Sequence, residues 1–207
     1  MTAGKSPVAG AAATGPSAWN IANGLTVLRI LLVPVFGWLL LVEGGREPSL
    51  RYWAAAAFAV AMITDRIDGD VARRHGLVTD FGKVVDPIAD KALIGMALVG
   101  LSILDEIPWW VTIVVLVREW GVTALRFFVM THGVIPASRG GKLKTAIQGL
   151  ALMLYILPLW TLSGADVWHG VAWVVLLVAV AVTLVTGFDY VRRGLALRRA
   201  ADRAVGR

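Results

Sequence analysis

Hydrophobic residues fill six long stretches of the chain, and short polar or glycine-containing segments separate them. The stretches lie at residues 24–43, 52–73, 83–104, 108–130, 143–163 and 168–191. Each is close to the ~20 residues that an α-helix needs to cross a bilayer. The second, third and fourth stretches also contain charged residues, which lower their mean hydropathy. The pattern predicts an all-α integral membrane protein with six transmembrane helices.

The composition supports this fold class and excludes several others. Hydrophobic residues make up 57% of the chain and charged residues only 16%, whereas soluble domains carry about 25% charged residues. Disordered proteins combine low hydrophobicity with high charge, which is the opposite pattern. Cysteine is absent, and this excludes disulfide scaffolds, thiolate metal sites and a cysteine nucleophile.

The positions of lysine and arginine predict how the protein is oriented in the cell membrane. Segments 105–107 and 164–167 contain no basic residue, whereas segment 131–144 and the end of the chain are basic. Cytoplasmic loops of membrane proteins are enriched in lysine and arginine. Both termini and the loops at 74–82 and 131–142 are therefore expected in the cytoplasm. A nucleic-acid partner is not expected, because the sequence has no soluble basic face.

The chain divides into three regions. Residues 1–18 are rich in Gly, Pro and Ala, and we expect a disordered cytoplasmic tail there. Residues 19–193 contain the six predicted helices. Residues 194–207 are rich in arginine, which predicts a basic cytoplasmic tail in contact with membrane lipids.

Four aspartates occupy regular positions around the break between the second and third stretches. Asp65 and Asp68 are three residues apart, and Asp86 and Asp90 are four apart. Such spacings place each pair on one face of a helix. The polar segment between the pairs is short, so we expect antiparallel neighbouring helices. The four carboxylates then converge in one polar pocket that faces the cytoplasm.

Four like charges in one apolar setting need compensation. Two unit charges 4 Å apart repel by about 4 kcal/mol at an effective dielectric constant of 20. Oxygen ligands favour hard divalent cations, and paired cations are a common arrangement for displacement at phosphorus. The alternative is that the aspartates cap helices or pair with nearby basic side chains. The sequence favours a metal site because ionisable groups inside membranes are usually functional.

The aspartates belong to the longer pattern D-x2-D-G-x2-A-R-x8-G-x3-D-x3-D. The positions that fill it are Asp65, Asp68, Gly69, Ala72, Arg73, Gly82, Asp86 and Asp90. This pattern resembles the signature of the CDP-alcohol phosphotransferase family. The resemblance implies a six-helix membrane enzyme, usually a homodimer, that transfers a substituted phosphate from a CDP-linked donor to an alcohol and releases CMP.

The resemblance also implies a role for each signature residue. Asp65, Asp68 and Asp86 would bind two divalent cations, Mg²⁺ or Mn²⁺. Asp90 would complete this metal site and act as the catalytic base on the acceptor hydroxyl. The CDP part of the donor would contact Asp65, Asp68, Gly69, Ala72, Arg73 and Gly82.

Three further segments resemble the phosphatidylglycerophosphate synthase branch of the family. They are Asn20–Arg29, Val117–Arg126 and Gly141–Thr145, with Ala22 at a position where that branch usually has proline. This resemblance implies CDP-diacylglycerol as the donor and glycerol 3-phosphate as the acceptor. Asn23 and Thr26 would hydrogen-bond the donor, although packing between helices explains them almost equally well.

A dianionic acceptor needs fixed cations beside the carboxylates. Arginine binds phosphate in a bidentate manner, and lysine provides a point charge. The candidate acceptor-phosphate residues are Arg118, Arg126, Arg139, Lys142 and Lys144. Simpler explanations exist for some of these residues. Lys142 and Lys144 could only set the membrane topology, and Arg118 could pair with a carboxylate such as that of Glu119. Arg29 is expected to meet a phosphate or a carboxylate.

Three other functions remain open at this point. The acceptor could be inositol phosphate or another alcohol, because its phosphate would need similar basic residues. Intramembrane prenyl transfer also uses aspartate pairs and Mg²⁺, but it leaves the glycines, Ala72 and Arg73 unexplained. An ion transporter with buried carboxylates is the alternative that is not an enzyme.

Overall fold

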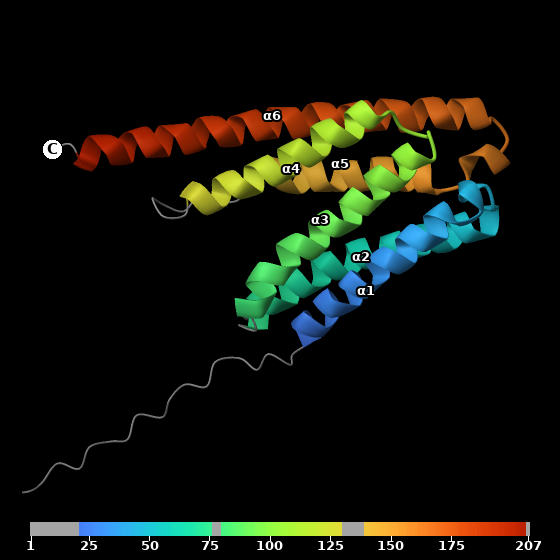
Figure 1. Cartoon of the computed structure of the whole chain (residues 1–207), viewed down its shortest axis with the longest axis horizontal. Coiled ribbons are helices and arrows are strands. Elements are labelled where there is room, and N and C mark those ends of the chain that lie inside the picture. Colours follow the sequence, from blue (N-terminus) through green and yellow to red (C-terminus); the bar gives the residue numbers. More distant parts are fainter. Residues whose placement is uncertain (1–20, 76–79, 130–138, 206–207) are drawn as a thin grey trace, which may run out of the picture.

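The computed structural model describes residues 21–75, 80–129 and 139–205. In these ranges the chain forms six α-helices and two short 3-10 helices, and it forms no strand (Figure 1). The elements are α1 (Ile21–Leu41), η1 (Val42–Gly45), α2 (Pro48–His75), α3 (Asp80–Ile103), α4 (Trp109–Val129), α5 (Arg139–Ile156), η2 (Leu159–Thr161) and α6 (Ala165–Val205). The all-helical fold class is confirmed, whereas the predicted tail at 1–18 lies outside the described residues.

Each of the six hydrophobic stretches corresponds to one α-helix, but two boundaries differ clearly from the prediction. Helix α5 ends at Ile156 instead of near residue 163, because Pro158 has no N–H group and disfavours helical backbone at the residue before it. Helix α6 continues to Val205, so the basic segment that begins at residue 194 extends this helix. Its alanine, leucine and arginine residues are strong helix formers.

The helices run alternately up and down, and their contacts form two groups. Helix α1 packs mainly against α2 and α3, while α6 packs against α4 and α5. The groups meet through contacts of α2 with α5 and of α3 with α4 and α5. Figure 1 shows the connections α1–α2, α3–α4 and α5–α6 at one end of the molecule. The start of α1 and the end of α6 lie at the other end.

A continuous hydrophobic core joins the helices. Its fully buried members include Phe36 on α1, Phe58 on α2 and Leu152 on α5, and the rings of the two phenylalanines have centroids 5.4 Å apart. Gly37 allows α1 and α3 to approach closely, because a Cβ atom there would lie 2.7 Å from Sδ of Met96. Small residues are typical of such close helix contacts in membranes.

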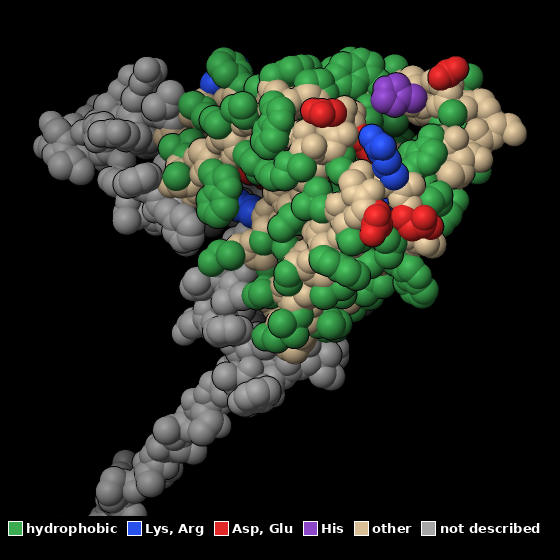
Figure 2. All heavy atoms as spheres, turned by 45° about the vertical axis from the view of Figure 1, so that its right-hand side comes forward, with side chains coloured by type: hydrophobic (Ala, Val, Ile, Leu, Met, Phe, Trp, Pro, Cys, Tyr) green, Lys and Arg blue, Asp and Glu red, His purple; other side chains and the backbone are tan. Residues whose placement is uncertain are grey.

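The outer surface is also largely apolar. Val117 on α4 is 67% exposed and Val185 on α6 is 69% exposed. Figure 2 shows hydrophobic side chains over most of the visible surface, with charged groups and histidine gathered near the end with the three connections. Exposed apolar area on this scale marks an interaction surface, and a lipid bilayer fits it.

Two helical segments are long and apolar enough to cross a membrane. They are Gly24–Gly45 and Ala165–Gly194, and shorter apolar helical segments occur at Lys91–Ile103 and Leu143–Ile156. These findings agree with a membrane protein, while the predicted crossing by all six helices belongs to the proposal below. Trp109 and Trp110 begin α4 and are exposed, as expected for tryptophans at a membrane interface.

Candidate active site

The signature residues lie on two consecutive helices. Asp65 and Asp68 are near the end of α2, and Asp86 and Asp90 are near the start of α3. Only residues 76–79 separate the two helices, and an extended chain of that length spans at most about 18 Å. The topology therefore brings the two carboxylate-bearing segments to the same end of the molecule, as the sequence predicts.

For most signature residues, the structure describes the backbone position but not the side chain. Helix α2 carries Gly69, Ala72 and Arg73, and α3 carries Gly82. The side chains of Asp68, Arg73, Asp86 and Asp90 lie outside the described part of the chain. Among the side chains that are described, no group of three potential metal ligands occurs. The four-aspartate metal site therefore stays a prediction.

Asp65 is the signature carboxylate whose side chain is described, and it forms an ion pair with α1. Its Oδ1 atom lies 2.6 Å from Nη1 of Arg29. The Arg29 side chain is completely buried, whereas the Asp65 side chain is 37% exposed. The expectation that Arg29 meets a carboxylate is confirmed. The pair attaches α1 to α2 and places a fixed positive charge beside the signature.

The donor candidates on α1 precede this ion pair. Thr26 lies three residues before Arg29, on the same face of the helix, and its side chain is buried. Asn23 lies on the first turn of α1, and its side chain is outside the described set. This face of α1 points toward the helix that carries Asp65.

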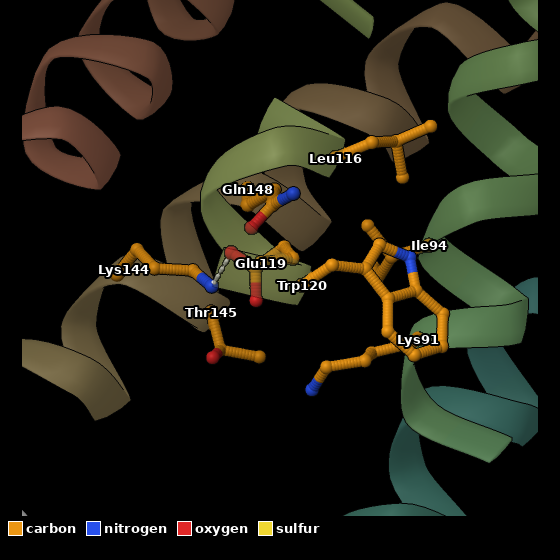
Figure 3. A pocket seen from close by; sticks show the side chains of 8 residues that line it. All are labelled: Lys91, Ile94, Leu116, Glu119, Trp120, Lys144, Thr145 and Gln148. Atoms are coloured by element: carbon orange, nitrogen blue, oxygen red, sulfur yellow. Dashed lines mark hydrogen bonds and ion pairs between the residues drawn. The ribbon is translucent and has the colours of Figure 1, made fainter. Parts of the chain in front are cut away.

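A narrow pocket lies between α3, α4 and α5 (Figure 3). Its lining residues are Lys91, Ile94, Leu116, Glu119, Trp120, Lys144, Thr145 and Gln148. Lys91 directly follows Asp90 in the chain, so the pocket adjoins the carboxylate-bearing part of α3. Sequence reasoning did not single out Lys91 or Gln148. The available signals were the position of Lys91 next to the signature and the isolated polar residue Gln148 in an apolar helix.

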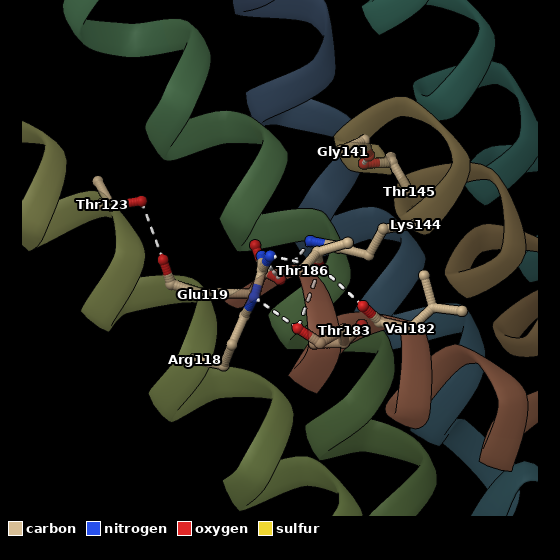
Figure 4. Close-up of polar contacts among 9 residues, drawn as sticks. All are labelled: Arg118, Glu119, Thr123, Gly141, Lys144, Thr145, Val182, Thr183 and Thr186. Atoms are coloured by element: carbon tan, nitrogen blue, oxygen red, sulfur yellow. Dashed lines mark hydrogen bonds and ion pairs between the residues drawn. The ribbon is translucent and has the colours of Figure 1, made fainter. Parts of the chain in front are cut away.

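Glu119 on α4 connects two of the predicted acceptor-phosphate residues (Figure 4). Its Oε1 atom accepts a hydrogen bond from the ammonium group of Lys144. The same oxygen lies 3.1 Å from Nη1 of Arg118. Both cations are mostly buried beside this carboxylate, since the side chains of Lys144 and Arg118 are 8% and 14% exposed. Oppositely charged partners are what buried cations need.

Arg118 also connects α4 to α6. Its Nε atom donates to the carbonyl oxygen of Thr183 at 3.0 Å, and its Nη2 atom donates to Oγ1 of Thr186 at 2.8 Å. The alternative that Arg118 pairs with Glu119 is thus confirmed. Lys144, in contrast, lines the pocket beside α3.

The remaining acceptor candidates are placed only by their helices. Arg126 is on the last turn of α4, and Arg139 and Lys142 are on the first turn of α5. Their side chains lie outside the described set, so their phosphate contacts stay predictions. All three positions are at the end of the molecule that carries the α2–α3 connection (Figure 1).

Comparison with known proteins decides between the enzyme classes. Residues 19–185 match the sequence model of the CDP-alcohol phosphatidyltransferase family, which covers most of the chain. The chain belongs to this family. Prenyl transfer and ion transport therefore do not describe it. The aspartate-rich ends of α2 and α3 are accordingly the candidate active site of a CDP-alcohol phosphatidyltransferase.

Similar proteins extend over nearly the whole chain. A probable phosphatidylglycerophosphate synthase of Mycobacterium tuberculosis is 54% identical over 176 residues, which cover 85% of this chain and 82% of the relative. A CDP-diacylglycerol–glycerol-3-phosphate 3-phosphatidyltransferase of Bacillus subtilis is 38% identical over 83% of this chain and 93% of its own length. A CMP-forming cardiolipin synthase of Streptomyces coelicolor is 33% identical over 149 residues, which cover 72% of this chain and 68% of the relative.

Proposed function

We propose that this protein transfers the phosphatidyl group from CDP-diacylglycerol to glycerol 3-phosphate and releases CMP. The observation that carries the proposal is the complete four-aspartate signature on adjoining helix ends, in a chain 54% identical to a probable phosphatidylglycerophosphate synthase. The relative named as a glycerol-3-phosphate phosphatidyltransferase, 38% identical, supports the same donor and acceptor. Both matches extend over more than four fifths of this chain.

Two divalent cations, Mg²⁺ or Mn²⁺, fit the residues present. Asp65 offers oxygen atoms, is partly exposed, and has its position fixed by the buried guanidinium of Arg29. Asp65, Asp68, Asp86 and Asp90 would together hold the cations, since carboxylate oxygens suit these hard ions. When bound, the cations would neutralise the charge of the donor diphosphate.

The protein's own residues would then position the reactants. Asn23, Thr26, Gly69, Ala72, Arg73 and Gly82 would receive the CDP part of the donor. Asp90 would accept the proton of the primary hydroxyl of glycerol 3-phosphate. The resulting oxygen nucleophile would form a bond to the β-phosphorus while the bond from that phosphorus to the CMP oxygen breaks. Positioning and electrostatic stabilisation supply most of the rate in such transfers.

The acceptor phosphate would be bound by the basic residues of α4 and α5. Lys144 is well placed for this role because it lines the pocket beside α3. Arg118 is held by α6 and Glu119, so we assign it mainly the task of fixing Glu119. Arg126, Arg139 and Lys142 would complete the binding of the phosphate from the ends of α4 and α5.

We further propose that all six helices cross the cell membrane and that the protein acts as a homodimer. The apolar outer surface, the lysine and arginine distribution, and the location of the start of α1 and the end of α6 at the same end of the molecule support the membrane arrangement. The active site and the termini would then face the cytoplasm. The acyl chains of the donor would stay in the bilayer beside the helices.

The proposed function is tested by measuring CMP release from CDP-diacylglycerol by the purified full-length protein with Mg²⁺ or Mn²⁺. Glycerol 3-phosphate, inositol phosphate and glycerol are supplied in parallel reactions. We expect CMP and a new anionic lipid only with glycerol 3-phosphate. Release with inositol phosphate alone would retain the family and the donor but contradict the proposed acceptor.

A further inference from the structure

Two polar groups in the pocket between α3, α4 and α5 have no partner among the residues that the structure describes. The side chain of Gln148 is almost completely buried, at 4% exposure, and its amide nitrogen makes no hydrogen bond. Lys91 forms no ion pair or hydrogen bond with the described residues. Buried polar groups are nearly always satisfied, so the Gln148 amide indicates a ligand that supplies the missing acceptor, and the partly exposed ammonium group of Lys91 is available to the same ligand.

The charge of the pocket favours an anion. The lining residues carry two ammonium groups, those of Lys91 and Lys144, and one carboxylate, that of Glu119, which leaves one net positive charge among them. The hydroxyl of Thr145 donates to the carbonyl oxygen of Gly141 at 3.2 Å, and its oxygen can still accept a hydrogen bond. The pocket therefore combines a cationic side with hydroxyl-binding groups.

The arrangement of these groups gives the pocket an open side. Figure 3 shows the ammonium group of Lys91 extending toward Thr145, below Glu119 and Trp120. The enclosed space among the lining residues is only about 10 Å³, room for about one water molecule, and the wider hollow of about 340 Å³ includes open solvent. Trp120 is half exposed and Lys91 is partly exposed. Glycerol 3-phosphate is larger than this enclosed space, so it would enter as the side chains of Lys91 and Trp120 move outward.

We propose that this pocket binds the glycerol phosphate moiety of the acceptor, with Lys91 and Gln148 as two further binding residues. Lys91 and Lys144 contact the phosphate, the Gln148 amide donates to a glycerol or phosphate oxygen, and Glu119 accepts from a glycerol hydroxyl. The proposal rests on the proposed function for the identity of the acceptor. It accounts for the unsatisfied amide of Gln148 in a pocket that is also lined by Lys91, the residue directly after Asp90.

The test uses the full-length protein in detergent and two substitutions. Gln148→Leu removes the amide at nearly constant volume, and Lys91→Met removes the charge but keeps the chain length. We expect each to raise the KM for glycerol 3-phosphate about 10-fold or more, with little change in the KM for CDP-diacylglycerol. Thr112→Val is the matched control, because it removes a buried hydroxyl that bonds Ser102 and the Leu98 carbonyl, outside the pocket.

Calorimetric binding of glycerol 3-phosphate separates this proposal from the proposed function. Glycerol, which lacks the phosphate, is the reference ligand. Weaker binding of glycerol 3-phosphate by both variants than by the wild type supports the proposed binding pocket, even if the wild type releases no CMP with this acceptor. An unchanged KM and unchanged binding in Lys91→Met and Gln148→Leu would overturn the proposal. An equal rise in the KM for the donor would also overturn it, since the pocket would then serve CDP-diacylglycerol. Lys91→Met alone decides the matter if Gln148→Leu does not fold.

Discussion

The ion pair between Arg29 and Asp65 is the best-defined contact of the candidate active site. The arginine is completely buried, and the aspartate remains partly open to solvent at 37% exposure. A donor that fixes the orientation of a metal-binding carboxylate usually contributes 10- to 100-fold to metal affinity or activity. We therefore regard Arg29 as a positioning residue for Asp65.

Arg29→Met is expected to lower CMP release about 10- to 100-fold. The cause is the loss of the group that orients Asp65, so the apparent affinity for the divalent cation should change as well. Arg29→Lys keeps the charge and should recover part of the activity. Arg192→Met, which changes an exposed arginine on α6, serves as the control. Full activity and unchanged metal affinity in folded Arg29→Met would contradict the assigned role.

Single-residue contacts were the hardest part to predict from the sequence. The sequence named Arg118 and Lys144 as phosphate-binding candidates, and it named Glu119 only as a possible partner of Arg118. The structure joins both cations to Glu119 and directs Arg118 to α6. The contacts of Glu119 with Lys144 and of Arg118 with Thr183 join helices far apart in the chain. Spacing along one helix therefore could not reveal them.

At the scale of helices, a second buried arginine holds the opposite end of the molecule together. Arg51 at the start of α2 forms an ion pair with Glu106 in the α3–α4 connection. Its Nη2 atom also donates to the carbonyl oxygen of Tyr155 at 3.1 Å, and its guanidinium carbon lies 5.0 Å from the centroid of the Trp160 ring. One side chain thus links α2 to α5, η2 and the α3–α4 connection.

Removing Arg51 should make the stability depend more strongly on pH. Burial raises the pKa of Glu106, and Arg51 opposes this shift. In Arg51→Met the folded-state pKa should rise further. Protonated Glu106 is then favoured in the folded protein, so stability falls as pH rises from about 4.5, the ordinary glutamate value, through the higher folded value. The double variant Arg51→Met/Glu106→Gln lacks this titration.

Thermal unfolding followed by tryptophan fluorescence measures this effect. We expect the single and double variants to unfold at similar temperatures near pH 4. Near pH 8 the single variant should unfold at a lower temperature than the double variant. The two pH values, about 4 and about 8, bracket the ordinary glutamate pKa of 4.5. Arg46→Met changes an exposed arginine in the α1–α2 connection. Its unfolding temperature should follow that of the wild type at both pH values. Equal unfolding temperatures of the two variants at both pH values would show that Glu106 carries no uncompensated charge.

The helices themselves followed closely from the hydrophobic pattern. All six α-helices start and end near the predicted stretches except at the end of α5 and in the length of α6. Pro158 was a visible signal for the early end of α5, but the apolar residues after it concealed the break. The extension of α6 was missed because hydrophobicity marks where a helix enters a membrane and does not mark where it ends.

For the whole molecule, the number of helices and their alternating direction could be predicted from the hydrophobic pattern, but the helix neighbours could not. We expected α2 and α3 to pack directly against each other. In the described ranges each packs more extensively against α1, which contacts both. This packing depends on the close approach at Gly37 and on Arg29, whose buried side chain joins α1 to α2. Such complementarity is a property of paired surfaces and is not visible in one segment.

The two ends of the molecule have different proposed roles. The end of α2, the start of α3, the start of α1 and the end of α6 lie at one end of the molecule (Figure 1). We propose that phosphatidyl transfer takes place at this end and depends on carboxylates that bind divalent cations. The opposite end, with the Arg51 contacts, serves stability. A substitution of one aspartate at each end therefore separates the two roles.

The most direct test compares CMP release by Asp86→Asn and Asp105→Asn over a titration with Mg²⁺ or Mn²⁺. Asp86 belongs to the signature on α3, whereas Asp105 is exposed in the α3–α4 connection and has a φ of 58°, which asparagine tolerates. We predict that Asp105→Asn matches the wild type, including complete loss of activity on chelation. Asp86→Asn should lose activity at every metal concentration. Metal-dependent activity at the wild-type level in purified Asp86→Asn would contradict the account.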